Sequence, residues 1–97
     1  MKKVYISGPI TGTTDYMERF KKAQEYLEGK GYTVVNPALI NSNLPEDTTW
    51  DEYMEISLIL VRMCDAIYLL KGWEESKGVE VELRTAKYFG MEIIKEL

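Results

Sequence analysis

The sequence predicts a single α/β domain built on a parallel sheet, and three observations lead to this fold class. Short apolar and β-branched stretches alternate along the chain with stretches of helical periodicity. The stretch 64–72 is apolar almost throughout, as expected of a strand buried on both faces of a sheet. The chain has 97 residues, which suits one hydrophobic core and hence one domain over 1–97.

The first part of the chain predicts a strand, a helix and a second strand. Residues 2–8, KKVYISG, have the β-branched and aromatic content of a strand. Residues 15–29 predict a helix, because apolar residues recur at helical spacing and Asp15 with Glu18 fits a capping box. Residues 32–36, YTVVN, predict the second strand, which ends at a proline.

The second part opens with a loop and a strongly signalled helix. Residues 37–48 are rich in Asn, Pro and Asp and predict a loop. Thr49 and Glu52 form a capping box at the start of a helix that runs to about residue 63. The remaining predicted elements are a strand over 64–72, a helix over 78–89 that stops at Gly90, and a strand over 91–97.

Strands joined through helices favour parallel pairing with right-handed crossovers. We therefore expect a flavodoxin-like or Rossmann-like three-layer α/β/α domain with about four strands in the order 2-1-3-4 and three helices. Ligands of such sheets bind beyond the carboxyl ends of the strands, where the strand order switches. The segments expected at this edge are GPITG (8–12), NPALI (36–40) and GWEESKG (72–78).

Composition excludes several kinds of site. The chain has no His and one Cys, which excludes Ser-His and Cys-His nucleophilic pairs and His-based or thiolate metal sites. Carboxylates, hydroxyls or tyrosines must then carry any chemistry, and we expect neither a metal nor a cofactor. The net charge of −4 disfavours nucleic-acid polymers, whose binding depends on Lys and Arg, whereas a small nucleotide remains compatible.

Two further expectations concern location and assembly. A lone cysteine, Cys64, fits a reducing compartment, and neither a bilayer-spanning run nor a signal peptide is recognisable, so we expect a cytoplasmic protein that does not bind membranes. The helix over 50–63 is apolar on most sides. One face would meet the sheet, and the other either meets a second copy in a homodimer or completes the core of a small domain.

The candidate chemistry lies in two segments. GPITG, residues 8–12, lacks the dinucleotide-binding and Walker patterns, so a tight glycine turn explains it at least as well as a ligand loop. Glu80 and Glu82 are expected in the first turn of the helix over 78–89, where acids are favoured by the helix dipole alone. Glu82, however, borders the predicted buried stripe and would lean over the strand ends, whereas Glu80 points to solvent. Tyr5, otherwise an ordinary strand aromatic, could reach the same cleft.

These residues add up to a family resemblance. Three stretches carry it, in the order KVYISGPITG, GYTVVNP and CDAIYLLKGWEESKGVEVEL. Together they resemble the nucleoside 2-deoxyribosyltransferase-like superfamily, in particular its small, DUF4406-like branch of bacteria and phages. The resemblance covers almost the whole chain in order. It implies cleavage or exchange of the N-glycosidic bond of a nucleoside or nucleoside 5′-monophosphate through a Glu nucleophile.

The family motif S-x-G-x-x-x-E falls on Ser76, Gly78 and Glu82. The resemblance implies that Glu82 attacks the anomeric carbon, as in a retaining glycosidase, and that Tyr5 orients it. It also implies binding of a 5′-phosphate or 5′-hydroxyl by Ser76 and the loop at Thr11. The other residues expected at the substrate are Gly8, Pro9, Ile10, Gly12, Asn36, Ser57 and Trp73.

One position departs from the family pattern. Relatives carry an Asp on the second helix, eight residues before the Asp of the CD pair, and that place holds Ser57 here. A serine cannot donate a proton as an acid does, and Glu55 lies about 200° around the helix. Three functions therefore stay open: an N-glycosidase or deoxyribosyltransferase, a nucleotide-binding module with impaired catalysis, and an interaction protein that uses the helix over 50–63.

Overall fold

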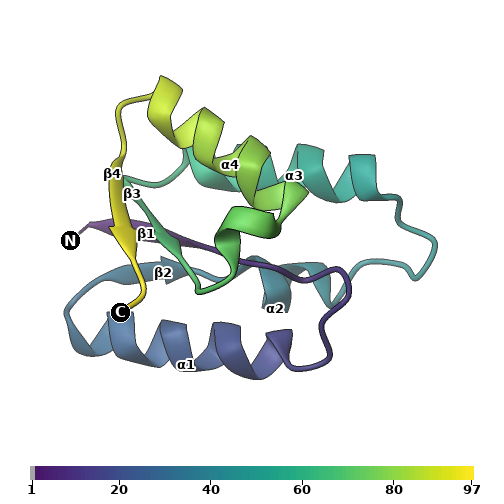
Figure 1. Ribbon diagram of the computed structural model, residues 1–97, viewed down its shortest axis with the longest axis horizontal. Helices are drawn as coiled ribbons and strands as arrows, with labels where there is room; N and C mark the ends of the chain where they lie inside the picture. The colour runs from purple at the N-terminus through teal and green to yellow at the C-terminus, as the bar shows by residue number, and fades with distance from the viewer. Residues whose placement is uncertain (1) are drawn as a thin grey trace.

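The computed structural model describes residues 2–97 and contains a four-stranded sheet flanked by helices (Figure 1). The strands are β1 (Lys3–Ser7), β2 (Thr33–Val35), β3 (Ala66–Leu69) and β4 (Glu92–Lys95). The helices are α1 (Tyr16–Gly29), α2 (Pro37–Asn41), α3 (Trp50–Arg62), the short 3₁₀ helix η1 (Trp73–Glu75) and α4 (Lys77–Tyr88).

The sheet has the predicted topology. The strand order is β2-β1-β3-β4, and all three pairings are parallel. In the register, Tyr5 of β1 lies opposite Val35 of β2 and Ile67 of β3. The carboxyl ends of β1 and β3 therefore lie together at the switch in strand order, the place where open α/β sheets bind ligands.

Helices cover both faces of the sheet, as the predicted three-layer architecture requires (Figure 1). Alternation along β1 divides its side chains between the two layers. Val4 and Ile6 pack with Phe20 of α1 on one face. Tyr5 packs with Val79 of α4 on the other face, in the same layer as α3.

Two sequence predictions about helices were wrong. Residues 37–48 were expected to form a loop, but the first five form α2, so that four α-helices occur among residues 2–97 instead of three. Asn36 explains this helix, because its side chain accepts hydrogen bonds from the backbone N–H groups of Ala38 and Leu39. Pro37 occupies the first helical position, where its fixed φ suits a helix start.

The two predicted capping boxes have different outcomes. The Thr49–Glu52 box is present in full at the start of α3. Asp15 precedes α1, but its side chain makes no capping hydrogen bond. Its backbone, with φ −111° and ψ 13°, lies outside the extended region in which an N-cap side chain reaches the first turn.

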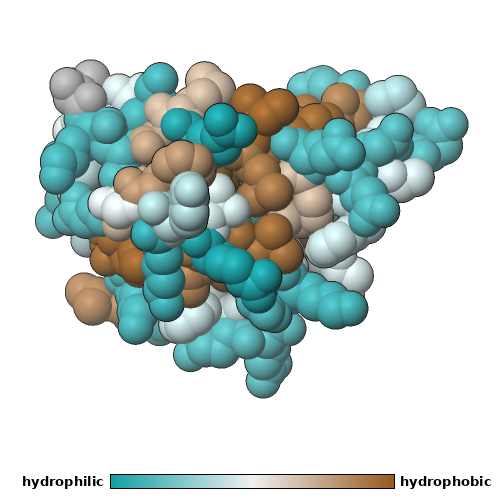
Figure 2. Space-filling model, turned by 90° about the horizontal axis from the view of Figure 1, so that it is seen from above, coloured by the Kyte–Doolittle hydropathy of each residue, from teal (hydrophilic) through white to brown (hydrophobic). Residues whose placement is uncertain are grey.

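The face of α3 that points away from the sheet is exposed to solvent in the single chain. Met54, Ser57 and Val61 are buried toward the sheet, whereas Ile59 is 59% exposed. Figure 2, which shows the side of the molecule that carries α3 and α4, has apolar groups gathered near the middle with polar groups around them. Among the described residues, no helix is long and apolar enough to cross a membrane.

Candidate functional site

The site lies where α4 begins, beyond the carboxyl ends of β1 and β3. Ser76 caps α4, since its hydroxyl accepts a hydrogen bond from the backbone N–H of Val79 at 3.3 Å. Because α4 begins at Lys77, Glu80 lies in the first turn and Glu82 in the second, not both in the first as predicted. Glu80 is exposed and pairs with Arg84 at 3.0 Å, whereas only 7% of Glu82 is exposed.

The Glu82 carboxylate is held by two hydroxyls of β1. Tyr5 donates from its phenol to Oε2 at 2.6 Å, and Ser7 donates from Oγ to Oε1 at 2.6 Å. Both donors are buried, and their spacing of two residues places them on the same face of the strand. Each carboxylate oxygen thus has its own fixed donor, which sets the plane of the group.

Burial dominates the electrostatics of this carboxylate. It raises the pKa of Glu82 to about 7, although hydrogen bonds from Ser7, Tyr5 and Ser57 act to lower it. Burial also raises the pKa of the Tyr5 phenol well above its usual value, so Tyr5 remains a protonated donor near neutral pH. Near neutrality Glu82 is therefore poised between a protonated acid and a carboxylate.

This pKa predicts a pH-dependent stability. Since the pKa of Glu82 rises from its ordinary 4.5 to about 7 on folding, its stabilising protonation is complete below pH 4.5 and lost as the pH rises through 7. We expect Glu82→Gln, a neutral isostere, to be more stable than the wild type by about 1–3 kcal/mol at pH 8.5 and nearly equal at pH 4.5. Urea denaturation at the two pH values measures this, and a difference independent of pH would contradict it.

A cavity of about 400 Å³ opens in front of Glu82, and we call it the inner cavity. It lies between the GPITG loop, the segment after α2, and the starts of α3 and α4. The buried Oδ1 of Asn41 has no hydrogen-bond partner within residues 2–97. The lining residues are Gly8, Ile10, Thr11, Tyr16, Ala38, Asn41, Ser42, Leu44, Glu46, Trp50, Tyr53, Met54, Ser57, Ser76, Gly78, Val79 and Glu82.

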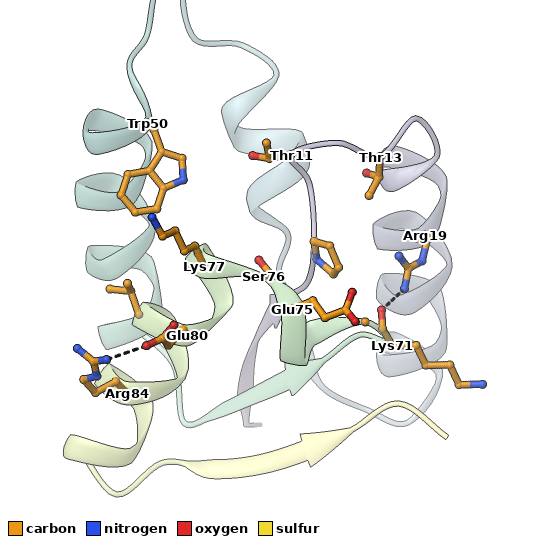
Figure 3. A pocket seen from close by; sticks show the side chains of 14 residues that line it. Thr11, Thr13, Arg19, Trp50, Lys71, Glu75, Ser76, Lys77, Glu80 and Arg84 are labelled. Atoms are coloured by element: carbon orange, nitrogen blue, oxygen red, sulfur yellow. Dashed lines mark hydrogen bonds and ion pairs between the residues drawn. The ribbon is translucent and has the colours of Figure 1, made fainter.

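A second cavity of about 960 Å³, the outer cavity, adjoins the first (Figure 3). In Figure 3, Trp50 and Lys77 lie on one side of it and Thr11, Thr13 and Arg19 on the other. Its charged lining residues are Arg19, Lys71, Glu75, Lys77, Glu80 and Arg84. Thr11, Trp50, Ser76 and Gly78 line both cavities, so the two spaces are continuous.

Most residues predicted to bind substrate line these cavities, and three do not. Gly8, Ile10, Thr11, Ser57, Ser76 and Gly78 line the inner cavity, and Pro9 lines the outer one. Gly12 forms a turn with φ 82°, and Asn36 caps α2, so neither lines either cavity. Trp73 lines neither cavity but a neighbouring hollow that shares Glu80 and Arg84 with the outer cavity, and Lys95 lies over its ring.

Sequence reasoning missed several residues of the site. Ser7 follows Tyr5 by two positions, and strand alternation could have revealed that both side chains face the same layer. Trp50 stands at the first position of α3 and lines both cavities. Asn41 and Glu46 carried no signal, because their places depend on how the segment after α2 folds back over the sheet edge.

Two solved structures that share this fold are 2-deoxyribosyltransferases. The 2-deoxyribosyltransferase of Bacillus psychrosaccharolyticus is 17% identical with a TM-score of 0.75, covering 96% of this chain and 70% of its own. The enzyme of Leishmania mexicana is 22% identical with a TM-score of 0.74, covering 98% of this chain and 63% of its own. At these identities the shared property is the fold, and the chain spans less than two thirds of the second protein.

The family model of the domain of unknown function DUF4406 matches residues 2–95, and the chain belongs to this family. No curated protein matches the sequence. The fold expected from the resemblance is thereby confirmed, while the activity and the roles of individual residues are matters for proposal.

Proposed function

We propose that the protein cleaves or transfers at the N-glycosidic bond of a nucleoside or nucleoside 5′-monophosphate, with Glu82 as nucleophile. One observation carries the proposal: a buried carboxylate that lines a cavity, with each oxygen fixed by a separate hydroxyl. A surface acid at a helix start is stabilised by the helix dipole and by water, without buried hydroxyl donors. Perturbed carboxyls in a cleft are a common sign of catalytic function.

The reaction is a double displacement. An oxygen of ionised Glu82 forms a bond to the anomeric carbon while the bond from that carbon to the base breaks, and the base nitrogen keeps the electron pair. Water or a second base then attacks the same carbon of the glycosyl ester and releases Glu82. Tyr5 positions the carboxylate through its hydrogen bond to Oε2.

The two cavities suggest how the substrate lies. The sugar would sit against Glu82, with the base in the inner cavity beside Tyr16 and Tyr53. The 5′ end would point toward Thr11 and Ser76 at the junction with the outer cavity. Thr11 and Ser76 line both cavities, and their hydroxyls would be the groups available there to a 5′-phosphate or 5′-hydroxyl.

The test is a panel of ribo- and deoxyribonucleosides and their 5′-phosphates, incubated with the protein and assayed for free base by chromatography. A second incubation with an added acceptor base separates transfer from hydrolysis. We expect base release with the wild type and none with Glu82→Ala. If no nucleoside or nucleotide loses its base, whether that base is neutral or cationic, the proposed function fails.

A second candidate function is nucleotide binding without efficient catalysis. Its specific support is Ser57, which is buried beside Tyr5 and Glu82 at the position where relatives carry an acid. Under this alternative, calorimetry detects binding of a nucleotide that the protein does not cleave. Loss of binding in Glu82→Ala, with Glu80→Ala unaffected, would then locate the binding pocket.

The protein would act as a homodimer joined through α3. Ile59 of α3, Met63 just after it and Phe89 just after α4 are all more than half exposed and line one hollow. Isologous dimers are the commonest way for such an apolar surface to be covered. We expect Ile59→Asp to dissociate the dimer in sedimentation at micromolar concentration, and a monomeric wild type there would contradict the proposal.

The cytoplasm remains the proposed location. Burial raises the pKa of the Cys64 thiol to about 11, so this cysteine stays protonated and unreactive near neutral pH. A free, buried thiol is compatible with a reducing compartment.

A further inference from the structure

The two joined cavities differ in charge. Two carboxylates, Glu46 and Glu82, line the inner cavity, and no Lys or Arg of residues 2–97 does. The outer cavity has four cationic side chains against two acids, namely Arg19, Lys71, Lys77 and Arg84 against Glu75 and Glu80.

An acidic cavity favours a cationic ligand group. A positive charge beside Glu46 and Glu82 is attracted by both carboxylates. The aromatic side chains of Tyr16, Trp50 and Tyr53 line the same space and offer faces that attract cations. A neutral purine or pyrimidine can stack on these rings and donate hydrogen bonds to the carboxylates, but it lacks the positive charge that both carboxylates attract.

The outer cavity favours the opposite charge. In Figure 3, the side chain of Lys77 extends toward Trp50. Arg84 is partly neutralised by its pair with Glu80, and Arg19 donates to the backbone oxygen of Lys71 at 2.6 Å. Lys77 is thus the cation best placed to meet a phosphate that emerges past Ser76.

We propose that the substrate is a nucleotide whose base is a cation joined through the N-glycosidic nitrogen, with its phosphate end in the outer cavity. The base would be a pyridinium or an N7-alkylated purine. This inference rests on the proposed function and specifies its substrate class.

The absence of an acid at position 57 fits this substrate. When the bond from the anomeric carbon to a cationic base breaks, its electron pair neutralises the nitrogen, and the base leaves without being protonated. Glu82 forms the ester bond at the same carbon, and water then hydrolyses the ester, yielding the free sugar hydroxyl and a proton. A neutral base would need a proton from a general acid, which Ser57 does not provide.

A cationic base would also activate the nucleophile. Burial raises the pKa of Glu82 to about 7, so part of the empty protein carries it protonated near neutrality. A positive charge nearby favours the ionised form and lowers the pKa. Binding of the correct substrate would then generate the carboxylate that attacks it.

The test compares substrates that differ in the charge of the base. Oxidised nicotinamide adenine dinucleotide and 7-methylguanosine 5′-diphosphate carry cationic bases, and guanosine 5′-diphosphate is the neutral match of the second. The assay is run at a pH where the base of the intact 7-methylguanosine nucleotide keeps its N1 proton, because loss of that proton would cancel the positive charge of the base. We expect base release from at least one cationic substrate, and the pair identifies whether a pyridinium or an alkylated purine fits the cavity.

Variants separate enzyme recognition from the intrinsic lability of cationic bases. Glu46→Gln removes one negative charge from the mouth of the inner cavity, where Glu46 is exposed, and should raise KM for the cleaved cationic substrate by up to about fivefold, the upper end of the range for exposed ion pairs. KM or Ki for guanosine 5′-diphosphate should change less than about twofold. Asp47→Asn is the matched control, because Asp47 is the exposed neighbour of Glu46 and lines neither cavity.

The phosphate end has its own test. Lys77→Gln should raise KM for the dinucleotide severalfold but leave KM for nicotinamide riboside, which has the cationic base without phosphate, nearly unchanged. Equal effects on the two would place the phosphates elsewhere and overturn that half of the inference.

Failure of the inference is distinct from failure of the proposed function. If only neutral-base substrates are cleaved, or if Glu46→Gln lowers kcat for neutral bases while sparing cationic ones, the cationic-base assignment is overturned and glycosidic cleavage stands. In the second case Glu46 would act as a general acid. If neither kind of substrate is cleaved, the proposed function itself is overturned.

Discussion

Glu82→Ala is expected to reduce the release of base by at least about 10⁴-fold, as removal of a nucleophile does in other enzymes. The variant cannot form the glycosyl ester, and water in the vacated space lacks the fixed orientation that Tyr5 and Ser7 give the carboxylate. Chromatography of free base under single-turnover conditions gives the measurement.

Glu80→Ala is the matched control for this prediction. Glu80 lies two residues away on the same helix, but its carboxylate is exposed and pairs with Arg84. Such surface pairs contribute at most about 1 kcal/mol, so activity and stability should change little. Equal activity in the two variants would refute the nucleophile assignment. So would the failure of a slow-hydrolysing 2-fluoro sugar analogue to leave an adduct on Glu82.

The Glu82→Ala variant should remain folded. Tyr5 and Ser7 lose their acceptor, but Glu82 lines the inner cavity, so removal of its side chain opens the vacated space to water that can accept from both hydroxyls. The change in unfolding free energy should therefore stay within about 2 kcal/mol. The helix-dipole reason expected from the sequence does not apply, because Glu82 lies beyond the first turn of α4. Circular dichroism of the two variants confirms that any loss of activity is not a loss of fold.

The parts of the site that could be predicted are those set by periodicity. Strand alternation and the order of elements place Tyr5 in the layer of α4, and the helical spacing of Val79, Glu82 and Ala86 turns the carboxylate inward. Both features follow from local sequence and from the rule that parallel strands end at one edge. They explain why Glu82 could be separated from Glu80 before any coordinates were known.

The parts that could not be predicted depend on how the connecting segments fold. Asn36 looked like a ligand residue at a strand end, but it uses its side chain to start α2. Trp73 comes soon after β3, yet at the start of η1 it packs against the core cluster that includes Leu69 and lines neither cavity. Asn41 and Glu46 come to the inner cavity because the segment after α2 crosses the sheet edge, which no periodicity encodes.

Ser57 connects the fold to the choice of substrate. It is 4% exposed on the buried face of α3, and its hydroxyl is close enough to Tyr5 and Glu82 to lower the pKa of both. A proton donor at this place could reach a leaving base in the inner cavity. The chain instead has a hydroxyl that assists the carboxylate, which suits a base that leaves without a proton.

Ser57→Asp is therefore expected to increase the release of neutral bases by roughly 10²-fold, the lower part of the range for general acid catalysis. Two carboxyl groups at this short range share one proton, because both cannot ionise freely in a buried site. The shared proton supplies the acid that a neutral base needs, while the ionised member attacks. Release of cationic bases should change little, because they gain nothing from protonation.

Ser57→Asn distinguishes acid catalysis from a change of shape, since Asn matches Asp in size but cannot donate an acidic proton. We expect no gain of neutral-base release with Asn, and a gain with Asp that declines as the pH rises and the shared proton is lost. Initial rates with guanosine 5′-diphosphate and deoxynucleoside 5′-monophosphates across pH 5–9 provide the comparison. A gain of equal size in both variants, or a gain that grows with pH, would show that position 57 acts through packing and not through proton transfer.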